Sequence, residues 1–134
     1  MNQHDLIAYA KQAMQKAYAP YSSFWVGAAL LAKDGSVYSG CNIENGAYPA
    51  TCCAERTAFF EAVKDGVRDF SAIAVVGGKN GEIVDFCPPC GVCRQVMAEF
   101  CDGDFEIYLT DGTAIQTLTL GEILPYSFRL TDKG

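Results

Sequence analysis

The chain has 134 residues, of which 50% are hydrophobic and 19% are charged, and its net charge at neutral pH is −6. A domain of this length can bury a substantial core, whereas an acidic chain without a Lys/Arg cluster is a poor partner for a nucleic-acid backbone. No apolar run approaches the ~18–20 residues of a membrane span, and the polar N-terminus lacks the basic start of a signal peptide. We therefore expect one cytoplasmic domain over residues 1–134.

The first third of the chain predicts a helix followed by a hairpin. Apolar residues recur at helical spacing over residues 3–18, and a proline two residues later cannot continue the helix. Residues 24–32 are apolar throughout, as in a strand that is buried on both faces. Asp34-Gly35 predicts a hairpin turn, and residues 36–41 form the returning strand.

From residue 42 onward the hydrophobic pattern alternates between helix and strand. Asp65-Gly66 ends the second helix because glycine suits the left-handed cap position, and Gly77-Gly78 is expected to close the third strand. The order predicts an α/β fold: a single three-layer domain with a five-stranded mixed β-sheet and helices on both faces. The expected elements are a polar loop at 42–51, a helix from Thr51 or Cys52, a strand at 70–76, a brief extension at 83–84, a helix at about 90–101, strands at 105–110 and 114–120, and one helical turn at 122–124.

Two short stretches, residues 51–56 and 88–95, contain residue types that bind a metal. Their C-x-E … P-C-x-x-C spacing is typical of zinc-dependent deaminases. Both stretches lie at expected helix starts, where partial positive charge and free N–H groups favour thiolate over thiol. Three thiolate ligands would leave the fourth zinc position to water, which distinguishes a catalytic from a structural zinc. The residues concerned are Cys53, Glu55, Cys90 and Cys93.

With these motifs, the sequence resembles the small cytidine deaminases of the homotetrameric, three-cysteine type. The resemblance covers nearly the whole chain in the family's order, and it implies a cytidine deaminase-like catalytic domain over residues 1–134. It also implies hydrolytic deamination of cytidine and deoxycytidine in pyrimidine salvage, one Zn²⁺ per subunit, and sites near the subunit interfaces of a homotetramer. The matching segments are Tyr18-Ala-Pro-Tyr-Ser-Ser-Phe24, Gly40-Cys-Asn-Ile-Glu-Asn45, Cys53-Ala-Glu-Arg56, Pro89-Cys-Gly-Val-Cys-Arg-Gln95 and Leu124-Pro-Tyr-Ser-Phe128.

The resemblance further implies a role for each site residue. Glu55 moves protons between the zinc-activated water and the pyrimidine, and Arg56 offsets the charge of the thiolates. Arg94 directly follows Cys93, and we expect it to share the task of Arg56. The implied metal ligands are Cys53, Cys90 and Cys93. The implied substrate contacts are Phe24 over the base, Asn42 and Glu44 on the ribose, Ala54, and Phe128 from a neighbouring subunit.

Each of these features has a simpler explanation. The cysteines could form a structural zinc site or a redox Cys-x-x-Cys pair, and the fourth ligand of a structural site could be Cys41, Cys52, Cys87 or Cys101. Glu55 could be a first-turn acid that the helix dipole favours. The nearest alternative function is deamination of another aminopyrimidine nucleoside, such as a blasticidin-type antibiotic. An alternative of another class is a zinc-binding module without catalysis.

Overall fold

The computed structural model describes residues 1–131. Its elements follow the predicted order, with a short 3₁₀ helix, η1, added before the second α-helix. The strand at residues 24–32 has the predicted bounds. The elements are α1 (Gln3–Met14), β1 (Phe24–Ala32), β2 (Val37–Cys41), η1 (Tyr48–Ala50), α2 (Ala54–Lys64), β3 (Phe70–Lys79), α3 (Gly91–Phe100), β4 (Glu106–Thr110), β5 (Ile115–Thr119) and α4 (Leu120–Ile123).

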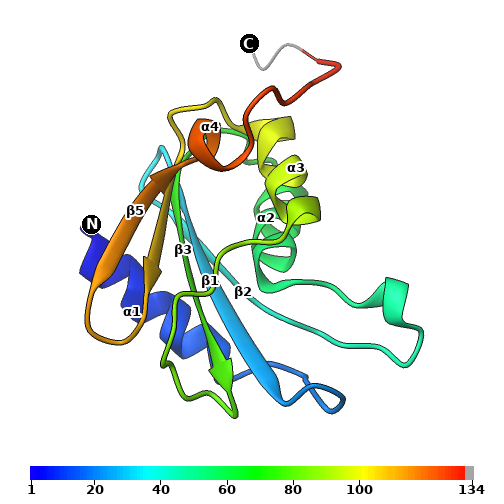
Figure 1. Cartoon of the computed structure of the whole chain (residues 1–134). Coiled ribbons are helices and arrows are strands. Elements are labelled where there is room, and N and C mark those ends of the chain that lie inside the picture. Colours follow the sequence, from blue (N-terminus) through cyan, green and yellow to red (C-terminus); the bar gives the residue numbers. More distant parts are fainter. Residues whose placement is uncertain (132–134) are drawn as a thin grey trace.

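The five strands form one mixed sheet in the order β2-β1-β3-β4-β5. The β3–β4 pair is parallel, and the other neighbouring pairs are antiparallel. Parallel neighbours need a crossover connection, and the segment that contains α3 supplies it. The predicted α/β fold with a five-stranded mixed sheet and helices on both faces is confirmed (Figure 1).

Successive residues of β1 face the two helical layers, as the pleat of a strand requires. Ala28 and Leu30 belong to the core cluster under α2 and α3, whereas Ala29 packs with the buried face of α1. Gly40 of β2 lies directly against α2, because a Cβ atom there would be 2.5 Å from the carbonyl oxygen of Ala54. This close approach fixes the start of α2, where the predicted site lies, against the sheet.

Some element boundaries differ from the predicted ones. α1 ends at Met14 and not at residue 18, because Tyr18 pairs with the loop instead: its N–H donates to Asn42 and its carbonyl accepts from Glu44. α2 begins at Ala54 with Cys53 as its N-cap, later than the predicted start at Thr51 or Cys52. Cys53 therefore lies at the N-terminal end of α2 rather than within the helix.

The prediction that Gly77-Gly78 closes the third strand is wrong. β3 continues to Lys79, and these two glycines pair with Val26 and Trp25 of β1. A Cβ atom at Gly78 would lie 1.8 Å from the carbonyl oxygen of Glu82, so the glycines permit close approach within the strand. Residues 83–84, which were expected to extend or pair briefly, are in neither strand nor helix.

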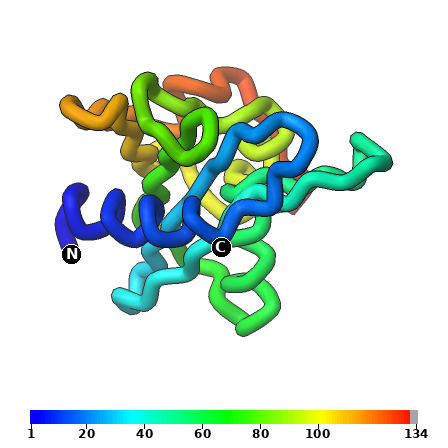
Figure 2. The backbone as a smooth tube through the Cα atoms, turned by 90° about the horizontal axis from the view of Figure 1, so that it is seen from below, coloured from blue at the N-terminus to red at the C-terminus, as the bar shows by residue number. Residues whose placement is uncertain are grey.

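The loop that precedes α2 extends away from the body of the chain in two perpendicular views (Figures 1 and 2). Its residues 45–50 are all exposed, including the side chain of Tyr48. No helix within residues 1–131 has the length and apolarity needed to cross a membrane.

Candidate active site

Three sulfur atoms meet where the N-termini of α2 and α3 approach each other. Cys53 is the N-cap of α2, Cys90 is the N-cap of α3, and Cys93 lies in the first turn of α3. The Cys53 and Cys90 sulfurs are 3.8 Å apart, the Cys90 and Cys93 sulfurs are 3.5 Å apart, and all three lie within 4.8 Å of one another. The sequence predicted this group correctly.

The spacing of the sulfurs fits zinc. A Zn–S distance of about 2.3 Å in tetrahedral geometry separates two sulfur ligands by about 3.8 Å. Within residues 1–131 no fourth His, Cys, Asp or Glu joins the group, so the four cysteines considered as a fourth ligand lie outside it. Cys53, Cys90 and Cys93 are free thiols. The donor set therefore offers three protein ligands and leaves a position for water.

The thiols differ in how readily they ionise. A hydrogen bond with Cys93 is the largest of the effects that lower the pKa of Cys53 to about 5, and the Arg56 guanidinium acts in the same direction. The same contact, together with burial, raises the pKa of Cys93. In the metal-free chain Cys53 is therefore the stronger acid of these two thiols.

Arg56 is the cation of the site. Its Nη2 atom donates to the Cys53 sulfur over 3.3 Å, and the Cys53 thiolate in turn raises the pKa of Arg56. Its Nε–H group is buried without a hydrogen-bond partner among the described residues. Three thiolates and Zn²⁺ carry a net charge of −1, which disfavours deprotonation of a bound water. The contact with Cys53 places a positive charge beside the sulfur group, and the predicted charge-compensating role of Arg56 stays a prediction.

Glu55 lies in the first turn of α2 and is only 4% exposed. Burial is the main reason that its pKa rises to about 7, and the negative charge of Cys53 adds to the effect. A carboxyl group with a pKa near the ambient pH can both take up and release a proton. Its position two residues after Cys53 brings this buried carboxyl group beside the sulfur group.

The side chain of Glu44 is held by hydrogen bonds from residues 21 and 22, in the segment just before β1. Its Oε1 atom accepts hydrogen bonds from the N–H groups of Tyr21 (2.9 Å) and Ser22 (3.1 Å), and its Oε2 atom accepts from the Ser22 hydroxyl. The Ser22 hydroxyl and then these N–H groups lower the pKa of Glu44 below its ordinary value. A carboxylate has about four acceptor sites, so one site on Oε2 is left for a ligand.

Asn42 and Phe24 are linked to the same segment. The Asn42 amide accepts from the N–H of Val26 (2.9 Å) and donates to the carbonyl of Phe24 (2.8 Å). The Ser22 hydroxyl accepts from the N–H of Phe24 over 3.0 Å. Asn42 keeps one N–H and one lone pair, and the Phe24 side chain remains 41% exposed. Sequence analysis missed Ser22, whose side chain connects Glu44 to the start of β1.

Gly77 was not predicted as a neighbour of the site, and Cys87 was considered only as a fourth ligand of a structural zinc. A Cβ atom at Gly77 would lie 2.8 Å from the Cys87 sulfur and 3.0 Å from the Phe24 ring. Both groups therefore pack directly against the glycine backbone. Burial raises the pKa of Cys87 to about 12, which keeps it a neutral thiol. A glycine inside a strand pattern signals such a close approach, but the sequence does not say what approaches.

For three predicted residues, the described contacts do not test the expected role. The Arg94 guanidinium donates to the carbonyls of Pro89 and Ile123, each over 2.8 Å, and contacts no sulfur among the described residues. Its predicted charge-compensating role therefore stays a prediction. Ala54 has no exposed surface, and Phe128 is 67% exposed, so their contacts with a substrate also stay predictions.

Comparison with known proteins identifies relatives of the whole chain. A model of the cytidine and deoxycytidylate deaminase zinc-binding region matches residues 1–109. A cytidine deaminase from Sporosarcina psychrophila is 54% identical over 133 residues, which are 98% of this chain and 95% of that protein. The crystal structure of a cytidine deaminase from Burkholderia pseudomallei superimposes with a TM-score of 0.88 at 48% identity, covering 96% of this chain and 100% of that one.

A blasticidin-S deaminase from Bacillus cereus is more distant. It is 32% identical over 107 residues, which are 77% of this chain and 76% of that protein. The alternative substrate considered from the sequence thus has weaker support than the nucleoside.

Proposed function

The chain belongs to the cytidine and deoxycytidylate deaminase family, and on this premise we propose that it hydrolyses cytidine and deoxycytidine to uridine and deoxyuridine. Water adds at C4 of the base, the exocyclic C–N bond breaks, and ammonia leaves. The observation that carries the proposal is the group of three sulfurs, without a fourth protein ligand among residues 1–131, beside the buried carboxyl of Glu55.

Glu55 accounts for the proton transfers of this reaction. Zinc held by the three cysteines supplies a Lewis acid, which makes water a nucleophile near neutral pH. Glu55 takes the proton from the attacking water and delivers it to N3 of the base, so that C4 becomes electrophilic. It then takes the remaining proton of the added hydroxyl group and delivers it to the amine, so that ammonia leaves as the C4 carbonyl forms. Its pKa of about 7 suits both directions of transfer, and Arg56 offsets the charge of the thiolates.

The residues around Glu44 favour a nucleoside over the free base. The free acceptor site on Glu44 and the remaining donor of Asn42 suit the hydroxyl groups of a sugar. The half-exposed ring of Phe24 suits the apolar face of a pyrimidine. The net charge of −6 disfavours substrates that carry a phosphate.

Changing Glu44 to Ala should raise KM for cytidine by about tenfold to a hundredfold, since a hydrogen bond to a charged group is lost. Turnover of cytosine, which has no sugar, should change little. Steady-state kinetics with both substrates test this. The Glu44→Gln variant keeps an acceptor for the N–H groups of residues 21 and 22, so it shows whether the effect of alanine comes from a changed loop conformation. Equal losses with both substrates would refute the ribose contact.

We also propose a homotetramer in the cytoplasm that acts in pyrimidine salvage, with one catalytic domain over residues 1–134. The exposed aromatic side chains of Tyr48 (73%) and Phe128 (67%) support the assembly, because a single chain leaves both uncovered. In the tetramer, Phe128 would contact substrate in a neighbouring subunit's site.

Metal analysis and an ultraviolet assay on the purified protein test the function together. We expect one zinc per subunit and ammonia release from cytidine and deoxycytidine, with slower release from a blasticidin-type antibiotic. Bound zinc without ammonia release would instead favour a non-catalytic zinc-binding module.

A further inference from the structure

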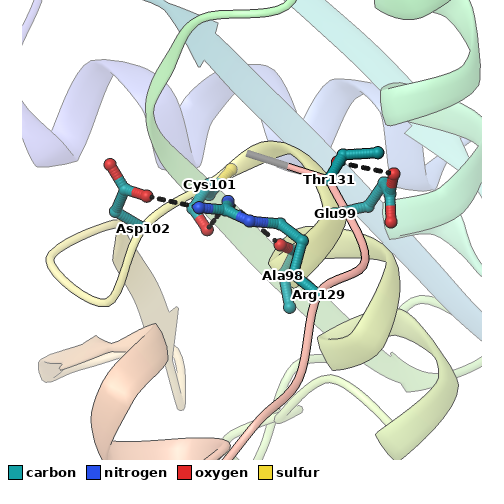
Figure 3. A network of polar contacts seen from close by, with 6 residues as sticks. All are labelled: Ala98, Glu99, Cys101, Asp102, Arg129 and Thr131. Atoms are coloured by element: carbon teal, nitrogen blue, oxygen red, sulfur yellow. Dashed lines mark hydrogen bonds and ion pairs between the residues drawn. The ribbon is translucent and has the colours of Figure 1, made fainter. Parts of the chain in front are cut away.

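The segment after α4 is attached to the C-terminal end of α3 by Arg129. The Nη1 atom of Arg129 donates to the carbonyls of Ala98 and Cys101, both over 3.3 Å, and Nη2 forms an ion pair of 3.1 Å with Asp102 (Figure 3). The last carbonyls of a helix have no partner within the helix. The guanidinium therefore both caps α3 and ties the following segment to it.

Two further contacts attach the same segment to the same helix. Gln95 of α3 donates to the carbonyl of Phe128 over 3.1 Å. Thr131 donates to Glu99 over 3.5 Å (Figure 3). Tyr126 has a φ of 55°, a conformation that is costly for a non-glycine residue and persists only where surrounding contacts impose it. Contacts with α3 and its C-terminal end thus hold the backbone from Phe128 to Thr131.

The aromatic side chains of this segment nevertheless point into solvent. Phe128 is 67% exposed and Tyr126 is fully exposed. A fixed backbone that holds apolar rings in water gains nothing within one chain, since exposed apolar surface is unfavourable. The arrangement makes sense where a second copy of the chain receives the ring.

We propose that Arg129 is a positioning residue for the reaction: it fixes the backbone so that Phe128 is already oriented for the neighbouring subunit's substrate. This inference rests on the proposed function, in which Phe128 acts in that site. A loose segment would have to be ordered each time substrate binds, and this cost would appear as weaker binding. Gln95 belongs to α3, the helix at whose start Cys90 and Cys93 lie. The same helix thus holds two sulfurs of its own subunit's site and the segment whose Phe128 ring would enter the neighbouring subunit's site.

Arg129→Ala should raise KM for cytidine about three- to tenfold, with kcat and zinc content unchanged. Arg129→Lys, which keeps a donor and the charge, should recover part of the loss. The matched control is Arg68→Ala, because Arg68 donates to the carbonyls of Val63 (2.8 Å) and Val67 (3.2 Å) at the end of α2 in the same way. If Arg68→Ala raised KM equally, the effect would be general destabilisation and the proposal would be wrong.

A double-mutant cycle separates positioning from an independent effect. Phe128→Ala should raise KM by itself, and adding Arg129→Ala should change it no further. If the increases in KM of the two single variants multiplied in the double variant, the proposal would be wrong. If Phe128→Ala raised KM and Arg129→Ala did not, positioning would fail while the proposed function stood. An unchanged KM in Phe128→Ala would remove the intersubunit contact itself, and the positioning role with it.

Mixed assemblies test the action between subunits. Arg129→Ala subunits have intact catalytic centres, and Glu55→Gln subunits have intact C-terminal segments but inactive centres. In tetramers that contain both, some active centres face an unaltered segment, so a fraction of the activity should show the wild-type KM. A KM that stays at the Arg129→Ala value in every mixture would contradict the proposal.

Discussion

Replacing Glu55 with glutamine is expected to lower kcat for cytidine by about 10³- to 10⁴-fold, while the chain folds and binds zinc as before. An amide of the same shape cannot take a proton from water or deliver one to the base, and proton transfer of this kind is worth up to about 10⁴-fold in rate. Glu55 is 4% exposed and its pKa is about 7. A neutral amide in that place therefore costs little stability.

Three measurements make the Glu55 prediction specific: kcat by ultraviolet assay, zinc per subunit by metal analysis, and the melting temperature. Glu61→Gln is the matched control, because Glu61 lies on the same helix but its side chain is 53% exposed in a surface ion pair with Lys64. We expect the control to behave as wild type. Turnover near the wild-type rate in Glu55→Gln, with zinc bound, would remove the proton-carrier assignment.

The parts of the site that the sequence predicted well are those set by local geometry. Cys53, Glu55, Cys90 and Cys93 belong to two segments whose internal spacing places each set at one helix start. The motifs do not predict that the two helix starts meet in space. The position of α3 follows from the crossover connection between the parallel strands β3 and β4. Such topology is not encoded in a short motif.

The missed or displaced features depend on contacts between residues far apart in the chain. Gly77 was taken as the end of a strand, but it continues β3 and pairs with Val26 of β1. A side chain there would meet the Cys87 thiol and the Phe24 ring. Arg94 follows a cysteine, yet its Nη1 atom reaches a carbonyl 29 residues away, at Ile123. Neither outcome can be read from neighbouring residues, since the partner is chosen by the folded chain.

Changing Cys93 to Ser should abolish zinc retention and bring deaminase activity to background. A serine hydroxyl stays protonated at neutral pH and is a poor zinc ligand, so the site would keep only two sulfurs. Cys93 is 1% exposed at the inner side of the group, where solvent cannot easily supply a replacement. The neighbouring control is Cys52→Ser, because Cys52 precedes Cys53 directly but lies outside the sulfur group. That variant should keep zinc and activity.

Stability gives the Cys93 prediction a readout that does not depend on catalysis. Zinc binds the folded chain, so a strong chelator should lower the Tm of the wild type by about 10 °C, given ~4 kcal/mol of binding-linked stability and a shift of ~2–4 °C per kcal/mol. Cys93→Ser should melt at a low temperature with or without chelator, whereas Cys52→Ser should respond as wild type does. A Cys93→Ser protein that held a full equivalent of zinc would show that this sulfur is not a ligand. Loss of zinc from Cys52→Ser would show that the ligand set had been assigned to the wrong one of two adjacent cysteines.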